Sequence, residues 1–237
     1  MISLTLGYNF NRPVKKDSLP KSLKTLTFGF YFNQQVNDLL PESLLNLTFG
    51  DSFNKNVDKL PINLTSLTFG YDFNQSVDNL PESLINLTFG GSFNKSVSKL
   101  PKSLVNLTFG SHFNKSISKL PMSITHLKFG GCFNKSVSKL PQNITYLALG
   151  ADFNKTINKL PNSITHMEVW SRENHVCNNI PQSVEYLKIN FEENDSSEDE
   201  INNLPFNLKE LTVNIKNYKK YIGKIPFGCK VIIVRNE

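Results

Sequence analysis

Three side chains that could act as a base, a nucleophile and an orienting acid stand at intervals of twenty residues. His112, Cys132 and Asp152 are the residue types of a cysteine-based active site. The same column of positions also contains unrelated polar residues, namely Ser52, Asp72, Ser92 and Arg172. That variety is typical of a solvent-facing corner, and no pattern of oxyanion donors accompanies it. We therefore predict that the chain has no catalytic residues and is not an enzyme.

Two histidines, His126 and His166, are the best candidates for metal ligands. They lie two repeats apart, which would separate their strands by about 9.6 Å in a parallel sheet. No carboxylate is suitably placed to complete a site with them. We expect no metal and no cofactor. The three cysteines form no disulfide framework: Cys132 falls on the surface, and Cys177 and Cys229 fall in core columns.

The elements that must position these side chains come from a repeat of twenty residues. A Leu-Pro or Ile-Pro pair recurs with Pro at 20, 41, 61, 81, 101, 121, 141, 161 and 181. One unit reads L-P-x-S-[LI]-x-x-L-x-F-G-x-x-F-N-x-x-[VI]-x-x. Each unit is too small to bury its own apolar face, so neighbouring units must stack. The repeat predicts a solenoid.

Each unit predicts one short strand. In the segment 107–109, Leu and Phe alternate with an outward Thr, and equivalent strands should pair in parallel into one long sheet. The return side is too short for a useful helix, so we expect it to be extended or polyproline-like, with essentially no helix. Gly110 closes the strand, and Asn190 and Asn214 replace it later. We interpret this column as a left-handed corner, to which Trp170 is an unexplained exception.

A second column consists of asparagines that follow the second Phe of each unit. A stacked row of amides can hydrogen-bond from one coil to the next and satisfy the corner backbone. We predict a structural ladder of Asn33, Asn54, Asn74, Asn94, Asn114, Asn134, Asn154 and Asn174.

We expect a single solenoid domain over residues 1–237. Its predicted parts are an uncapped first repeat (1–18), regular repeats (19–160), divergent repeats with an acidic insertion near 192–200 (161–225), and a C-terminal capping strand (226–237).

The combined motif L-P-x-S-L-x-x-L-x-F-G-x-x-F-N resembles the FNIP repeat, a short relative of leucine-rich repeats found in social amoebae and giant DNA viruses. The resemblance covers nearly the whole chain and is strongest over 19–160. It implies a leucine-rich-repeat-like fold and a role in protein interaction. Members of the family often carry an F-box, which implies substrate recognition for ubiquitin ligases. Here the repeat begins at the first residues, so that role would require a separate F-box protein.

Specific contacts should come from outward strand positions, where a solenoid binds its partners. The residues at these positions are small, polar and similar to one another in the first five units, and they become more varied in the next four. Tyr and His offer amphipathic contact area. We predict a partner-binding patch of His126, Lys128, Tyr146, His166, Glu168, Tyr186 and Lys188.

The net charge of +6 is unevenly distributed. Residues 91–160 contain ten lysines and a single acid, Asp152, whereas 191–200 contain six acids. The lysines form two stripes on the return side, but neither aromatic residues nor arginines are interleaved with them. We therefore predict a solvated face and disfavour nucleic acid as a partner.

The N-terminal strand lacks a capping segment, so its edge and apolar layer should seek a partner. We predict a homodimer through an edge formed by Ile2, Leu4 and Leu6. The sequence has no secretory signal and no apolar stretch of transmembrane length, and we expect an intracellular protein with no membrane contact. The leading hypothesis is a non-enzymatic, self-associating scaffold that binds proteins. The alternative is a substrate adaptor for a ubiquitin ligase.

Overall fold

A computed structural model describes residues 2–171, 177, 179–191, 200–214 and 222–234 of the 237-residue chain. The chain forms two compact units, Met1–Ile124 and Thr125–Glu237. Each unit is a stack of similar coils, and each coil contributes one strand. The predicted division of a single solenoid domain into four parts stays a prediction.

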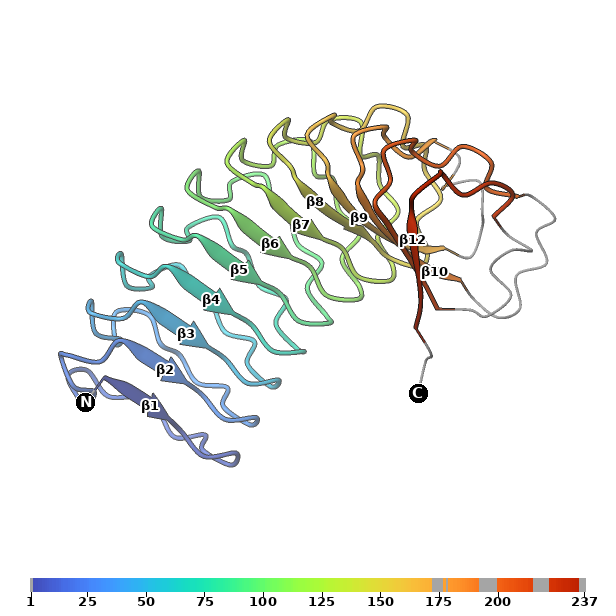
Figure 1. Cartoon of the computed structure of the whole chain (residues 1–237). Helices are drawn as coiled ribbons and strands as arrows, with labels where there is room; N and C mark the ends of the chain where they lie inside the picture. Colours follow the sequence, from blue (N-terminus) through green and yellow to red (C-terminus); the bar gives the residue numbers. More distant parts are fainter. Residues whose placement is uncertain (1, 172–176, 178, 192–199, 215–221, 235–237) are drawn as a thin grey trace. The chain divides into compact units, whose positions relative to one another are not determined.

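The first unit contains six parallel strands that pair in sequence order (Figure 1). Equivalent residues of successive repeats face each other, so that Leu26 pairs with Leu47 and Leu47 with Leu67. The register is therefore that of the repeat itself. The strands are β1 (Ser3–Thr5), β2 (Thr25–Thr27), β3 (Asn46–Thr48), β4 (Ser66–Thr68), β5 (Asn86–Thr88) and β6 (Asn106–Thr108).

The second unit is built in the same way, and all its strands but the first are longer than those of the first unit. They are β7 (His126–Lys128), β8 (Tyr146–Leu149), β9 (His166–Ser171), β10 (Tyr186–Phe191), β11 (Glu210–Val213) and β12 (Lys230–Ile233). Among the described residues, neither unit contains an α-helix. The prediction of a leucine-rich-repeat-like solenoid with short parallel strands and essentially no helix is confirmed. No helix in the described ranges could cross a membrane.

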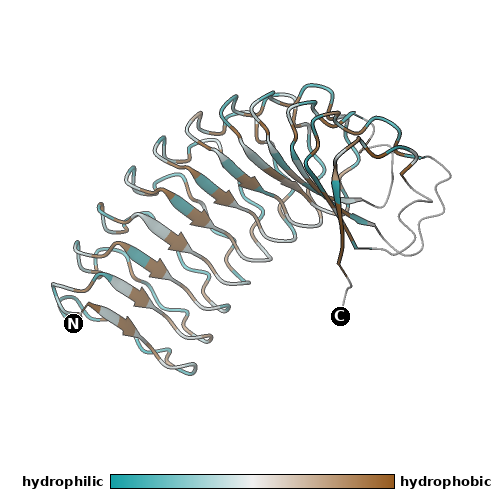
Figure 2. Ribbon diagram, in the orientation of Figure 1, coloured by the Kyte–Doolittle hydropathy of each residue, from teal (hydrophilic) through white to brown (hydrophobic). Residues whose placement is uncertain are grey.

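The core of each coil is a flat apolar layer. In the coil that contains β3, Phe49 and Phe53 are almost fully buried, and their rings stack with centroids 3.7 Å apart. Phe53 also stacks on Phe73 of the next coil, at 6.1 Å. Figure 2 shows hydrophobic and hydrophilic bands alternating along the strands, as the period-two pattern predicts. Because inward positions are fully used by the core, only outward and corner positions are free to vary.

The glycine column is not the left-handed corner that the sequence suggested, and that prediction is wrong. Among the described residues, φ is positive only at Asp17, Asp38 and Gly228. The column needs glycine because coils approach closely there. A Cβ on Gly90 would overlap the carbonyl group of Gly70 and lie 2.8 Å from the backbone nitrogen of Tyr71.

The asparagine ladder is observed in both units. In the first unit each backbone N–H donates to the Oδ1 of the Asn one coil earlier, at 2.9–3.0 Å, from Asn33 on Asn11 to Asn114 on Asn94. In the second unit the N–H of Asn154 donates to Oδ1 of Asn134 at 3.2 Å. The predicted ladder is confirmed over these residues, and Asn174 lies outside the described residues. Serines support the Leu-Pro corner in a similar way, as where Ser103 Oγ donates to the carbonyl of Leu84 at 2.6 Å.

Candidate functional site

The predicted patch lies on the outward face of β7 to β10, within the second unit. Register places its aromatic residues in one column, in the order His126, Tyr146, His166, Tyr186. A neighbouring column, two residues further along each strand, contains Lys128, Ala148, Glu168 and Lys188. Parallel pairing thus assembles side chains that are twenty residues apart in sequence onto one surface.

Glu168 is the centre of this surface. Its side chain is only 13% exposed and pairs with the ammonium of Lys188 at 3.1 Å. The hydroxyl of Tyr146 donates to its Oε2 at 3.0 Å, and the indole N–H of Trp170 donates to its Oε1 at 3.1 Å. The side-chain amide of Asn190 also donates to Oε1, at 3.4 Å. Four donors from three strands therefore hold one half-buried carboxylate.

The electrostatics of the cluster follow from this arrangement. Burial on its own would raise the pKa of Glu168, but the hydrogen bonds from Lys188, Tyr146 and Trp170 and the charge of Lys188 outweigh it, so that the pKa is lowered. The pKa of Tyr146 is raised to about 12, first by burial, then by the negative charge of Glu168 and the hydrogen bond to it. Glu168 is thus ionised and Tyr146 protonated at neutral pH, and the cluster is a fixed network with no poised acid or base.

Two histidine–tyrosine stacks lie beside the network. The rings of His166 and Tyr186 are 4.5 Å apart and 10° from parallel, and those of His126 and Tyr146 are 5.9 Å apart. The ammonium of Lys209 lies 6.0 Å from the Tyr186 ring and forms an ion pair with a neighbouring carboxylate. Trp170 is 48% exposed and Tyr186 38% exposed, so large aromatic surfaces face solvent in fixed positions.

The structure brings part of the predicted patch together and leaves part of it separate. Tyr146, Glu168 and Lys188 form one connected cluster. Lys128 is exposed and forms no ion pair within the described part of the chain, since the small, buried Ala148 stands between it and Glu168 in the register.

Sequence reasoning missed two members of the site, Trp170 and Asn190. Both replace the close-approach glycine, and there the strands β9 and β10 continue to six residues. Extending the period-two alternation from His166 through Glu168 would have placed Trp170 on the outward face.

The residues considered for catalysis and metal binding are spread over several coils. His112 lies in the first unit, where its Nδ1 contacts the carbonyl oxygen of Gly91 at 2.9 Å. Among the described residues, no group of three or more His, Cys, Asp or Glu is placed to hold a metal ion. Cys177 is buried, which raises the pKa of its thiol to about 12. Cys132 is half-exposed, and Cys229 is also half-exposed rather than part of the core.

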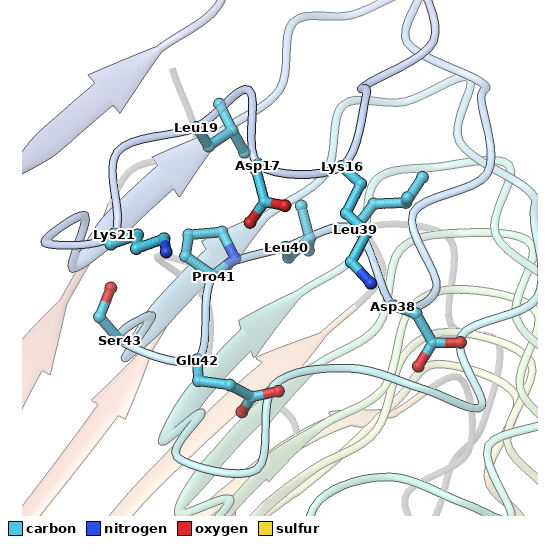
Figure 3. Close-up of a pocket in the computed structure, with 10 residues that line it drawn as sticks. All are labelled: Lys16, Asp17, Leu19, Lys21, Asp38, Leu39, Leu40, Pro41, Glu42 and Ser43. Carbon is cyan, nitrogen blue, oxygen red and sulfur yellow. The ribbon is translucent and has the colours of Figure 1, made fainter.

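A surface cavity of about 360 Å³ lies in the first unit at the Leu-Pro corner (Figure 3). Asp17 and Asp38, with φ of 58° and 59°, belong to its lining. Four residues separate Val36 from Pro41, whereas three separate Val57 from Pro61, and the extra residue is accommodated by the left-handed turn at Asp38. Three carboxylates and two ammonium groups line the cavity together with three leucines and a proline.

The predicted self-association edge lies at β1. Ile2 is 71% exposed, and Leu4 and Leu6 are half-buried. β1 pairs with β2 along one edge, and no strand among the described residues pairs with its other edge.

Comparison with known proteins agrees with the repeat and its geometry. The family model for the FNIP Repeat matches residues 1–31, 32–72, 56–90, 73–112, 93–132 and 133–169. The chain belongs to the FNIP repeat family. Among solved structures, it is similar to CroV588, described as a novel circular LRR protein, with a TM-score of 0.70 and 33% sequence identity over 98% of this chain. The chain spans 40% of the length of CroV588, and no curated protein matches it. In this FNIP protein, family membership thus accounts for the fold, while the cluster around Glu168 is built from the non-repeating positions.

Proposed function

We propose that this FNIP protein is a non-enzymatic scaffold that binds a protein partner through the outward face of β7 to β10. One observation carries the proposal: the exposed ring of Trp170 is held by the half-buried Glu168 carboxylate, and the exposed ring of Tyr186 is held by its stack on His166. Tyr and Trp in fixed positions contribute most of the energy in many protein interfaces, because little conformational entropy is lost on binding.

The contrast with the first unit supports the same face. The corresponding outward residues there are Thr, Ser and Asn, which offer little contact area. The outward face of β9 and β10 presents Trp170, His166 and Tyr186 next to the cluster of Glu168 and Lys188. Polar groups beside exposed rings are the usual composition of a protein-binding surface.

Affinity capture with the tagged full chain tests the proposal. We expect the double variant Trp170→Ala/Tyr186→Ala to lose a bound partner at least tenfold, because two interface anchors are removed. Asn106→Ala, at an outward position of β6, is the matched control and should retain the partner. If the double variant retains every partner as well as the control does, this face is not the binding site.

We further propose that the chain self-associates through β1. An open edge with the exposed Ile2 can pair with its symmetry mate about a two-fold axis, which closes the edge in both copies. Sedimentation at tens of micromolar should show a dimer for the wild type and a monomer for Leu4→Lys. Thr27→Lys, on the outward face of β2, is the control and should remain dimeric. A monomeric wild type would contradict the proposal.

The role of substrate adaptor for a ubiquitin ligase is the alternative, and it rests on the family resemblance. An F-box protein among the partners captured from the native host would favour it over a simple scaffold. Both roles are compatible with the intracellular location that the sequence suggests.

A further inference from the structure

The return side of the first unit contains a surface that the proposed protein-binding face does not use. Two successive coils repeat the pattern Asn-Lys-Ser-apolar-Ser-Lys, at 94–99 and 114–119. Their exposed side chains are called here the lysine–serine strip, which consists of Lys95, Ser96, Ser98, Lys99, Lys115, Ser116, Ser118 and Lys119.

The strip has a fixed geometry. Val97 and Ile117, at the centre of each pattern, are buried in the core, so that the flanking side chains must point outward. The hydroxyls of Ser96 and Ser98 lie 3.2 Å apart, and the next coil repeats this pair at the same distance. The backbone N–H of Ser98 donates to Ser96 Oγ at 3.4 Å, which closes a tight turn. Each coil therefore presents two hydroxyls between two ammonium groups.

The hydroxyls and lysines surround a shared hollow. A surface cavity of about 350 Å³ is lined by residues of both coils, namely Ser96, Ser98, Lys115, Ser116, Ser118 and Lys119. All its lining residues are lysines or serines, so that every polar group around it can donate a hydrogen bond.

Aspartates in the earlier coils neutralise the lysine one coil later, Lys99 of the strip included, and the serines of the strip cannot do so. Asp38, Asp58 and Asp78 occupy the position that Ser98 and Ser118 occupy later. Lys59 pairs with Asp38 at 2.8 Å, and Lys99 pairs with Asp78 at 3.4 Å. Each of these ammonium groups reaches the aspartate one coil earlier.

Lys119 stands one coil after Ser98, where the carboxylate has been replaced by a hydroxyl. Within the described part of the chain, Lys95, Lys115 and Lys119 form no ion pair. The strip thus accumulates positive charge at the spacing of the coils, about 4.8 Å. Repelling charges kept side by side favour a ligand that brings several negative charges at once.

We propose that the lysine–serine strip binds a linear phosphate chain through its oxygens. Ammonium groups supply charge and hydroxyls supply hydrogen bonds, which together match phosphate oxygens. The strip has no aromatic residue on which a base could stack, as single-stranded nucleic acid sites usually have. The ligand class is therefore a phosphate polymer without bases, of which inorganic polyphosphate is the simplest member.

The second unit repeats the same chemistry once more. Lys135, Ser136, Ser138 and Lys139 follow the pattern, and the two hydroxyls are 2.9 Å apart. The feature thus occurs in three consecutive coils of the sequence.

Binding of labelled inorganic polyphosphate to the full chain, at about 50 mM salt, tests the proposal. Ser98→Asp/Ser118→Asp restores the carboxylates of the earlier coils and leaves every lysine in place. We expect at least tenfold weaker binding, and a salt dependence whose slope falls by about 0.7 for each lysine neutralised. Ser98→Asn/Ser118→Asn is the matched comparison, because it removes the same two hydroxyls without adding charge and Asn also favours this turn; it should bind several-fold more tightly than the aspartate pair. Lys115→Gln/Lys119→Gln should weaken binding like the aspartate pair.

Three outcomes would overturn the proposal. The first is no binding of polyphosphate at 50 mM salt, and the second is equal binding by the aspartate and asparagine variants. The third is binding of single-stranded RNA with the same number of phosphates more than tenfold tighter than polyphosphate, which would indicate recognition of bases elsewhere on the protein. Circular dichroism of each variant excludes misfolding as a cause, and both Asp and Asn occur naturally at this position, in Asp78 and Asn158.

Discussion

Substitution of Gly90 by alanine should separate two neighbouring coils. A Cβ at this position would overlap the carbonyl group of Gly70 and lie 2.8 Å from the nitrogen of Tyr71, where ordinary contacts are 3.4–4 Å. The nitrogen alone would have to retreat by about 0.6 Å, the difference between 3.4 and 2.8 Å. Since it belongs to the backbone of a paired coil, the shift must strain the stack. Overpacking of side chains costs about 1–3 kcal/mol, and overlap with backbone should reach or exceed about 3 kcal/mol.

Two other glycines, Gly91 and Gly131, supply matched controls. A Cβ on Gly91 would meet the ring of Tyr71, which is half-exposed and can rotate away, so we expect a loss below about 1 kcal/mol. A Cβ on Gly131 would meet nothing within 4 Å, and alanine there should stabilise the fold slightly, by about 0.4–1 kcal/mol. Urea unfolding measures the stability of the three alanine variants. Hydrogen exchange then locates the disturbed coils, since repeat arrays need not unfold in one step.

Gly90→Asn distinguishes close approach from a left-handed corner. Asparagine tolerates positive φ, so a left-handed corner would accept it at little cost. Close approach predicts that asparagine is at least as destabilising as alanine, because it also carries a Cβ. A Gly90→Asn variant as stable as the wild type, or a Gly90→Ala variant no worse than Gly131→Ala, would refute the reasoning.

Three further predictions concern the side-chain networks. The lowered pKa of Glu168 means that its ionised form stabilises the fold at neutral pH, and this contribution should fade as the pH falls below the ordinary value of 4.5; the difference in unfolding free energy between wild type and Glu168→Gln should shrink between pH 6 and pH 3. The pKa of Tyr146 is raised to about 12, so its stabilising effect should be fully present below pH 10 and be lost as the pH rises from 10 to 12; in a spectroscopic titration, Tyr146→Phe should remove a tyrosine that ionises near pH 12. Oδ1 of Asn74 accepts a hydrogen bond from the backbone N–H of Asn94 at 3.0 Å, so Asn74→Ala should cost about 1–2 kcal/mol in thermal or urea unfolding, whereas Asn74→Asp keeps the acceptor and should cost less.

Most of the fold could be predicted from the repeat. The alternation around Leu107 and Phe109 gives the strand and its inward face, and the spacing of twenty gives parallel pairing in register. The asparagine ladder also follows from spacing alone, because one amide per coil at a constant corner has the next amide within reach.

The glycine column shows where sequence pattern becomes ambiguous. A missing Cβ suits both a positive φ and a close backbone approach, and the replacement by Asn190 favoured the first explanation. The structure instead lengthens the strand at Asn190 and Trp170, which changes the backbone rather than preserving a turn. A single sequence gives no distance between coils, so only the structure distinguishes a close backbone approach from a positive φ.

The candidate site depends on that same departure from the repeat. Where glycine ends the strand, only two outward columns exist, and a residue such as Glu168 would have no third column beside it. Where Trp170 and Asn190 replace glycine, the strands extend, and both residues donate to the Glu168 carboxylate. The constant positions build the core and the ladder, and a cluster with specific contacts forms only where the constant pattern fails. The same reasoning applies to the lysine–serine strip, which arises where Asp78 gives way to Ser98 and the pairing of charges between coils ends. In a repeat protein of this kind, function is therefore to be sought at the coils where a column changes its residue type.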